Sequence, residues 1–169
     1  MIRPVRLLPD PVLSLACRPV ERIDDEALAL AADLVDTMRA TSHSVGVAAP
    51  QIGVSLRAFC IDVTGHPKAR SCHGEVLLFN PVVDRSSVES APAEIGREGC
   101  MSVPDLTGDV ARRPALVVRG IAPTGAEVIL EVDAFEARAV QHELDHLDGL
   151  LFLDRVVAGE RVFRRRTYR

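Results

Sequence analysis

A His-Glu-x-x-His segment most restricts what this chain can fold into: His142-Glu143-Leu144-Asp145-His146. Residues four apart lie one turn from each other on one face of a helix, so a helical segment brings both imidazoles to the same side. Two such imidazoles can bind one metal ion, while Glu143 lies beside the ion and is free to carry a proton. The motif also arises by chance, with its histidines solvated or hydrogen-bonded in the core.

The surrounding residues predict an amphipathic helix that lies in the middle of the molecule. Asp133 is a favourable N-cap, and Glu136 three residues later suits a capping box. No glycine or proline occurs over 135–147, and Gly149 suits the left-handed position after a helix. Apolar or metal-facing side chains recur with helical spacing. These side chains are Phe135, Ala139, Val140, His142, Leu144, His146 and Leu147.

The known classes of His-Glu-x-x-His metal hydrolase differ in the residue that supplies the third metal ligand. One class has a glycine three residues after the second histidine and a further histidine three residues later; Gly149 fits, but Phe152 stands at the second position. Another class takes a carboxylate from a following helix, for which Asp154 and Glu160 are the nearby choices. Little chain remains there for a second ligand helix.

Cys100 is the better choice for the third ligand. It follows Gly99 and precedes a short apolar stretch, so its thiol could lie at the end of a strand packed against the helix. Thiolates bind zinc and ferrous iron strongly. Two histidines and one cysteine leave a fourth coordination position open, which is typical of a catalytic site rather than a closed structural one.

The remaining pattern predicts an α+β fold, with mixed or antiparallel strands packed around the central C-terminal metal-binding helix. A helix is expected up to about residue 39, after the acidic run 24–26. Strands are expected at 56–63, 76–80, 82–88, 115–121 and 127–132, with Pro81 breaking the second from the third. Residues 89–97 and 105–109 are expected to be irregular.

Size and charge limit the other functions. At 169 residues we expect a single catalytic domain, 1–169. A net charge of −4 gives no general footprint for DNA, no stretch is long enough to span a membrane, and the N-terminal residues lack a secretory apolar segment. We therefore expect a cytoplasmic protein with reduced cysteines. The arginine-rich tail could touch ribosomal RNA phosphates, although a basic terminus is usually just solvated.

Three separated segments together resemble the three motifs of peptide deformylases. They occur in the same order and with similar spacing, and the resemblance spans about residues 6–154. The segments are Gly46-Val47-Ala48-Ala49-Pro50-Gln51, Glu98-Gly99-Cys100-Met101-Ser102 and Gln141-His142-Glu143-Leu144-Asp145-His146-Leu147.

The resemblance implies a metal ion held by Cys100, His142 and His146, most commonly Fe²⁺, with Zn²⁺ or Ni²⁺ able to replace it. The implied reaction removes the formyl group of N-formylmethionine from newly made polypeptides and releases formate. Glu143 is then the general acid and base. The Gln51 amide and the backbone N–H of Met101 would bind the developing oxyanion.

The resemblance also implies a substrate path in which the peptide pairs with backbone near Gly46 as an added strand. The residues expected to line this path are Val45, Gly46, Glu98, Phe135, Arg138 and Ala139.

The chain departs from the family pattern at three positions. Ser44 stands where the family usually has glycine, and Met101 replaces a leucine. Arg138 stands where an apolar wall for the methionine side chain is expected; we expect its stem to pack and its head to reach solvent, the alternative being a reshaped pocket. Glu98 and Arg112 are expected to form an ion pair that braces the Cys100 segment, the alternative for Arg112 being a plain surface role.

Two other interpretations stay open on the sequence alone. A zincin-type endopeptidase would cleave blocked internal peptide bonds. A folded module with a purely structural metal would need four protein ligands and would not depend on Glu143.

Overall fold

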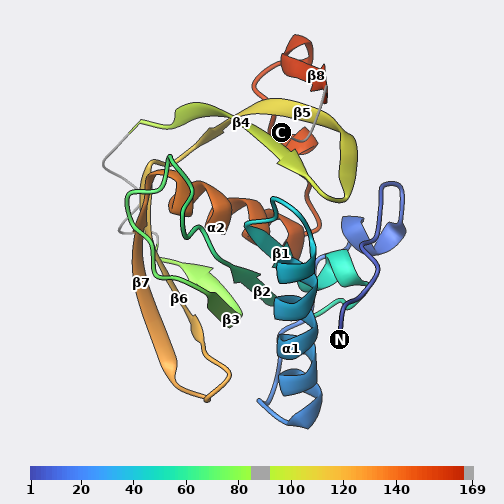
Figure 1. Cartoon of the computed structure of the whole chain (residues 1–169), viewed down its shortest axis with the longest axis vertical. Coiled ribbons are helices and arrows are strands. Elements are labelled where there is room, and N and C mark those ends of the chain that lie inside the picture. Colours follow the sequence, from blue (N-terminus) through green and yellow to red (C-terminus); the bar gives the residue numbers. More distant parts are fainter. Residues whose placement is uncertain (85–91, 166–169) are drawn as a thin grey trace.

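Helix α2 (Ala134–Leu147) lies between two antiparallel sheets in the computed structural model, which describes residues 1–84 and 92–165 (Figure 1). The other helix of this length, α1 (Asp25–Ala40), packs against strands β1 (Gly46–Ala48) and β2 (Ala58–Ile61). Both the α+β class and the central C-terminal helix are as the sequence predicts. None of the described helices is long and apolar enough to cross a membrane.

The larger sheet has five strands in the order β1-β2-β3-β6-β7, and every neighbouring pair is antiparallel. Its strands are β1 (Gly46–Ala48), β2 (Ala58–Ile61), β3 (Val76–Val83), β6 (Ala115–Ile121) and β7 (Glu127–Asp133). The smaller sheet has the order β4-β5-β8, made of β4 (Glu94–Cys100), β5 (Val103–Arg112) and β8 (Val162–Arg164). Short 3-10 helices lie at Pro11–Ser14, Ala49–Ile52, Phe152–Arg155 and Gly159–Arg161.

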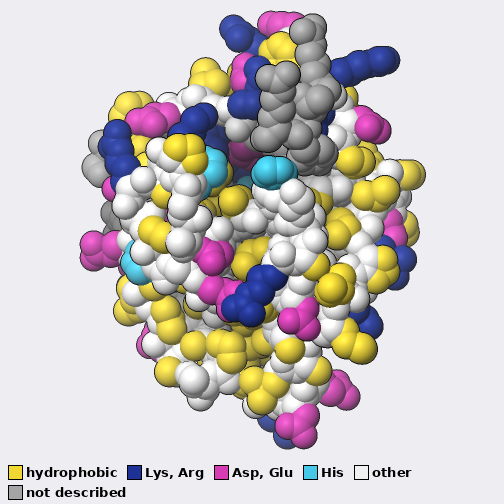
Figure 2. Space-filling model, in the orientation of Figure 1, with side chains coloured by type: hydrophobic (Ala, Val, Ile, Leu, Met, Phe, Trp, Pro, Cys, Tyr) yellow, Lys and Arg dark blue, Asp and Glu magenta, His cyan; other side chains and the backbone are white. Residues whose placement is uncertain are grey.

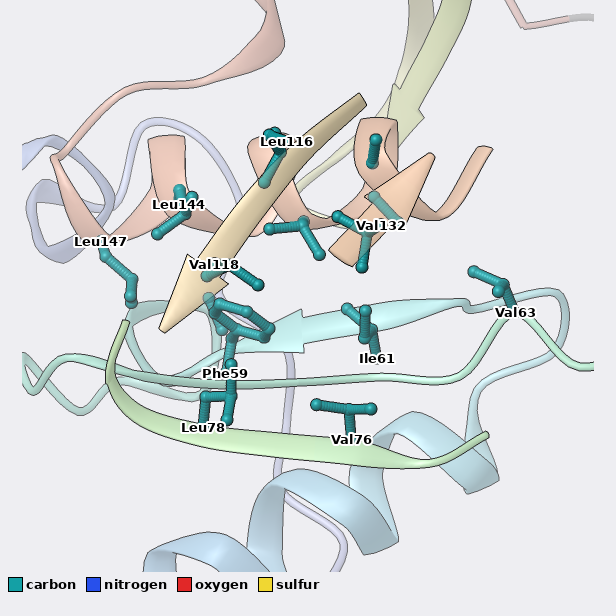
Figure 3. Close-up of a cluster of buried hydrophobic side chains, with 14 of the residues drawn as sticks. Phe59, Ile61, Val63, Val76, Leu78, Leu116, Val118, Val132, Leu144 and Leu147 are labelled. Carbon is teal, nitrogen blue, oxygen red and sulfur yellow. The ribbon is translucent and has the colours of Figure 1, made fainter. Parts of the chain in front are cut away.

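Alternation along β2 places the larger sheet between the two helices. Phe59 and Ile61 point into the cluster that includes Leu144 and Leu147 of α2 (Figure 3), whereas Ala58 and Cys60 point into the cluster formed with α1. Successive side chains of a strand face opposite sides of a sheet, so one short apolar strand serves both clusters. This packing fixes α2 against the sheet and aims its other face at β4 and β5.

The strand predictions fail where the pattern is polar or interrupted. Strand β3 continues through Pro81 instead of ending there, because its pairing with β6 shifts register between Phe79 and Val82. Asn80 adopts a positive φ of 50° at this irregularity, and its side chain exchanges two hydrogen bonds with the backbone of Val20. An irregular position of this kind tolerates proline. Residues 85–88 of the predicted strand lie outside the described residues.

The β4–β5 hairpin is a larger correction. The stretch 92–97 was expected to be irregular and 105–109 to be a loop, but these residues belong largely to paired strands, Glu94 opposite Arg112 and Glu98 opposite Gly108. Glycine-rich, charged strands with one solvated face lack the apolar alternation on which strand prediction depends. Residues 89–91 lie outside the part of the chain that the structure describes.

The start and end of α2 were predicted with mixed success. The helix begins after Asp133, but the capping box is wrong: the Asp133 side chain accepts a hydrogen bond from Ser71 N at 2.8 Å, and the buried Glu136 carboxylate accepts one from His73 N at 2.9 Å. The preceding loop therefore uses both acidic groups as its anchors. Gly149 follows the helix with a φ of 75°, as predicted.

Candidate active site

Three potential metal ligands converge where α2 meets the end of β4. One ligand atom from each of Cys100, His142 and His146 lies within 4.8 Å of the others, and Cys100 Sγ is 3.2 Å from His146 Nε2. Cys100 is the last residue of β4, and the two histidines face it from one side of the helix, with their rings 5.1 Å apart. Helical spacing and the strand end therefore build the set as the sequence predicts.

The Cys100 sulfur carries the electrostatic signature of a thiolate. Burial alone would raise its pKa, but the positive charge of His146 and hydrogen bonds from His142 and His146 outweigh burial and hold the pKa well below the usual thiol value. Gln51 Nε2 at 3.3 Å and the Ser102 backbone N–H at 3.4 Å also donate toward the sulfur. A thiolate is the form of cysteine that binds a metal ion.

Glu98 orients His142 from behind. The His142 Nδ1 atom lies 2.9 Å from Glu98 Oε2, and because a carboxylate only accepts, the proton belongs on Nδ1 and Nε2 is left for a metal. Glu98 also accepts hydrogen bonds from the guanidinium groups of Arg112 and Arg138. Arg112 Nη1 in turn donates to Oδ2 of the buried Asp145 at 2.6 Å. Burial would raise the pKa of Glu98, but the hydrogen bonds and charges of Arg112 and His142 hold it well below the usual value.

Glu143 is buried at the open side of the ligand set. Its burial raises its pKa to about 7, although the positive charges of His142 and His146 act in the opposite direction. Its Oε2 atom is buried without a hydrogen-bond partner among the described residues. Gly46 makes this position possible, since a Cβ there would lie 2.9 Å from Glu143 Cδ.

Gln51 presents its amide N–H groups to the same space. The Ala48 backbone N–H donates to Gln51 Oε1 at 2.9 Å, which fixes the amide so that Nε2 points toward Cys100 and Ser102. The 3-10 helix over Ala49–Ile52 turns the chain tightly enough for the Gln51 side chain to reach the backbone N–H of Ala48, three residues earlier. The amide is therefore a preorganised donor beside the ligand set.

A cleft of about 690 Å³ opens onto these groups between β1, β4 and α2. Figure 2 shows this face hollowed, with histidine side chains at the rim. Every residue predicted for the site lines the cleft except His146, which is buried behind it and 1% exposed. The predicted residues that line it are Val45, Gly46, Gln51, Glu98, Cys100, Met101, Phe135, Arg138, Ala139, His142 and Glu143.

The expectation that the Arg138 head reaches solvent is wrong. The side chain is only 14% exposed, and its guanidinium donates to Glu98 Oε1 at 2.9 Å and to the Val110 and Glu94 carbonyls at 3.0 and 2.8 Å. The acceptors come from β4 and β5, whose pairing the sequence did not reveal. Arginine adopts such a buried position when its donors are satisfied.

Two residues, one in the cleft and one buried behind it, were missed from the sequence. His66 stacks on Phe135 with ring centroids 3.5 Å apart, and Ser102, fully buried, accepts from Gln51. His66 had been assigned only to a polar loop, and no pattern in that loop indicates its fold over the helix. For Ser102 the signal was present, since it ends the second motif, yet no role was assigned to it.

The donor set fits a divalent cation. It combines one thiolate and two imidazoles, and one oxygen of the adjacent Glu143 carboxylate is buried with no hydrogen-bond partner in the part of the chain that the structure describes. The set found among the described residues has three protein ligands and no fourth, so an ion held there would keep one coordination position for water or substrate from the cleft. Fold and site together define a metal-dependent hydrolase.

Comparisons with known proteins identify the family. The family model for polypeptide deformylase matches residues 2–162. A peptide deformylase of Pseudothermotoga lettingae is 42% identical over 161 residues, covering 95% of this chain and 86% of its relative. The chain therefore belongs to the polypeptide deformylase family.

Solved structures of the family have the same fold. The crystal structure of peptide deformylase from Ehrlichia chaffeensis has a TM-score of 0.86 at 28% identity, covering 95% of this chain and 91% of that chain. A class I type b peptide deformylase from Acinetobacter baumannii, crystallised with Met-Ala-Ser bound, has a TM-score of 0.81 at 31% identity, covering 92% and 99%.

Proposed function

We propose that this chain removes the N-formyl group from N-formylmethionine at the start of newly made polypeptides and releases formate, with residues 1–169 acting as one catalytic domain. Membership of the polypeptide deformylase family supports the reaction. The observation that carries the assignment of residues is the convergence of Cys100, His142 and His146 beside a buried Glu143 oxygen that has no hydrogen-bond partner over residues 1–84 and 92–165.

Cys100, His142 and His146 would hold the ion, which we propose to be Fe²⁺, with Zn²⁺ or Ni²⁺ able to replace it. A bound divalent ion supplies Lewis acidity, which lowers the pKa of water and polarises a carbonyl. The softness of one thiolate and two imidazoles suits any of these ions. Glu98 holds His142 in the tautomer that leaves Nε2 available.

Glu143 would move the proton in the reaction. Its carboxylate takes a proton from the attacking water and gives it to the leaving amine nitrogen of the methionyl residue, so that the C–N bond breaks and formate leaves. Burial raises the pKa of Glu143 and the charge of a bound cation would lower it, so the carboxylate can accept a proton from water and then donate it to the leaving amine. Because Gly46 has no Cβ, the carboxylate can lie directly against β1.

Gln51 and Met101 would stabilise the charge that develops on the formyl oxygen. Gln51 Nε2 already points toward the ligand set, and Met101 follows Cys100 at the edge of the cleft. Donors held in place before reaction stabilise a transition state without the cost of reorganisation.

The peptide would lie along the outer edge of β1. The Val45 carbonyl accepts from Asp62 N across to β2, so alternation directs the N–H and C=O of Gly46 away from β2 and toward the cleft. A substrate strand can pair with that edge. Met-Ala-Ser bound to the Acinetobacter baumannii protein supports a peptide of this kind as product.

Formate release from formyl-Met-Ala-Ser by anaerobically purified protein, with metal analysis of the same sample, tests the proposal. Glu143→Gln should retain the metal and lose about 10²-fold to 10⁴-fold in turnover. Cleavage of a blocked internal peptide without formate release would instead favour an endopeptidase. Full activity of Glu143→Gln would contradict the assigned acid–base role.

Air sensitivity distinguishes the ions. Fe²⁺ beside a thiolate is open to oxidation, and Cys100 can then be oxidised stepwise. We expect activity to decay in air and to persist anaerobically. Equal activity after prolonged aeration would favour zinc.

We also propose cytoplasmic action with a ribosome contact through the arginine-rich C-terminal tail. Arg161 and Arg164 are exposed on or next to β8, and residues 166–169 lie outside the described residues. Co-sedimentation of the wild type and an Arg161→Ala/Arg164→Ala variant with ribosomes at two salt concentrations tests this; equal binding would oppose a role for these two side chains.

A further inference from the structure

The C-terminal strand β8 extends the β4–β5 hairpin into a three-stranded sheet (Figure 1). It pairs antiparallel with β5, with Thr107 opposite Phe163, and the backbone N–H of Arg165 donates to the Asp105 carbonyl at 2.8 Å. The family model matches only as far as residue 162, so Phe163 and Arg165 lie beyond it. A role for these two side chains therefore belongs to this chain and does not follow from the family match.

Alternation along β4 divides its side chains between two faces of the small sheet. Glu98 and Cys100 contact the two metal-binding histidines, so Gly99 between them faces away from α2. Gly99 pairs with Thr107 of β5, and Thr107 pairs with Phe163 of β8. These three residues form a row across the outer face of the sheet, which is the face opposite α2.

Arg165 lies on this outer face directly against Gly99. A Cβ on Gly99 would lie 3.0 Å from Arg165 Cζ and closer still to its Nη2, so the guanidinium occupies space that any other side chain would need. Both residues line the cleft. Because Gly99 immediately precedes the metal ligand Cys100, the C-terminal segment brings a positive charge to the wall of the cleft one residue from the ligand set.

Arg97 adds a second positive charge to this wall. Its Cζ lies 3.8 Å from the centroid of the Phe163 ring, and its Nε donates to Asp109 Oδ1 at 2.6 Å. Arg97 and Arg165 both line the cleft, whereas the carboxylates that counter their charges, Asp109 and Asp105, are not among the cleft residues. The outer edge of the small sheet therefore presents positive charge to a molecule bound in the cleft.

A substrate bound as proposed would meet this charge after its first residue. The formyl carbon must reach the ligand set while the peptide backbone follows β1, and successive side chains of an extended peptide point to opposite sides. A first side chain directed into the cleft therefore leaves the second directed outward. At about 3.3 Å per residue, the second and third residues lie within reach of a long side chain held one residue from Cys100.

We propose that Arg165 is a specificity-determining residue that favours substrates with a carboxylate side chain on the second or third residue of the peptide. The inference rests on the proposed function, since it concerns the residues that follow the formylated methionine. A guanidinium binds a carboxylate through paired, charge-assisted hydrogen bonds. Arg97, held by Phe163 and Asp109, adds to the attraction without having to move.

Peptide amides of the form formyl-Met-X-Ser-NH₂ and formyl-Met-Ala-X-NH₂ test the proposal, where X is Glu or Gln. The amide removes the terminal carboxylate, which would otherwise bind the same guanidinium. For the metal-loaded wild type we expect kcat/KM to be about twofold to fivefold higher for Glu than for Gln at one of the two positions, which is the range of a partly exposed ion pair. The difference should lie in KM rather than kcat, and it should shrink at high salt.

Variants of Arg165 separate this role from a general loss of activity. Arg165→Gln should bring the Glu-to-Gln ratio close to one, Arg165→Glu should reverse it, and Arg165→Lys should keep part of it. Arg164→Gln is the matched control and should keep the wild-type ratio, because Arg164 is exposed on the other face of β8 and does not line the cleft. The ratio for each variant is insensitive to the fraction of active enzyme.

The outcomes distinguish this proposal from the proposed function. An active wild type that hydrolyses the Glu and Gln peptides equally at both positions would overturn the role of Arg165 and leave the deformylase activity standing. A wild-type ratio that Arg165→Gln and Arg165→Glu leave unchanged would do the same. Metal-loaded wild type that releases no formate from any peptide, formyl-Met-Ala-Ser included, would overturn the proposed function itself.

Discussion

The Nδ1 atom of His142 lies 2.9 Å from Oε2 of Glu98, and both side chains are nearly enclosed by β4, β5 and α2. Glu98 is the centre of a buried charge network, since Arg112 and Arg138 bind its other lone pairs and Arg112 also binds Asp145. The position of one metal-binding histidine is thus coupled to the packing of the hairpin against the helix.

Glu98→Gln should weaken metal binding by about 10-fold to 100-fold, because the amide cannot hold the His142 tautomer as the carboxylate does. It should also lower the free energy of unfolding by roughly 3–5 kcal/mol, since Arg112 and Arg138 lose a buried counter-charge. Chelator competition on folded protein and denaturant titration measure the two effects. Glu94→Gln, an exposed glutamate on the same strand, serves as the control; equal metal affinity in both variants would contradict the orienting role.

Gln51→Ala should lower kcat by about 10²-fold to 10³-fold with little change in KM, because in the proposed mechanism the Gln51 amide is a donor to the developing oxyanion. Steady-state formate release on metal-loaded protein measures this. Gln141→Ala is the matched control, since that amide binds backbone groups of Arg113 and Ala137. Similar losses in both variants would indicate a structural effect instead.

The local pattern predicted the helix and its ligands because both depend on spacing along one segment. His142 and His146 need only helical geometry to face one side, and Gly149 needs only a favourable φ. Cys100 was reachable from thiolate chemistry and the motif order, although its contact with the helix is long-range. These parts of the site follow from local sequence patterns and need little knowledge of the tertiary structure.

The remaining parts depend on contacts between distant segments. Arg138 was misplaced because its acceptors are carbonyls of a hairpin whose strands carry no apolar alternation. Asp133 occupies the N-cap position of α2 as predicted, but its side chain and that of Glu136 form no capping box, because they accept hydrogen bonds from the Ser71 and His73 backbone N–H groups instead. In each case the sequence identified the polar side chain, but not the backbone group from a distant segment to which it hydrogen-bonds.

Ser44→Ala should lower KM for formyl-Met-Ala-Ser by about twofold to tenfold and leave kcat nearly unchanged. The Ser44 hydroxyl donates to the Gly46 carbonyl at 3.1 Å, and that carbonyl is the acceptor that an added substrate strand would use. Removing the hydroxyl frees the carbonyl for the peptide. Ser42→Ala, which also lines the cleft, is the control. An unchanged or higher KM for Ser44→Ala would mean that the hydroxyl does not compete with substrate.

Gly46→Ala should lower kcat by roughly 10²-fold, because the new Cβ would lie 2.9 Å from Glu143 Cδ and closer still to Glu143 Oε1. The carboxylate must then move, and a shift of about 1 Å in a reacting group can cost that much in rate. Metal content should stay unchanged, since the ligands come from β4 and α2. Gly159→Ala is the matched control, because its Cβ would enter open space. If Gly46→Ala kept full turnover with bound metal, the Glu143 carboxylate would have to act from a position other than the one it occupies against β1.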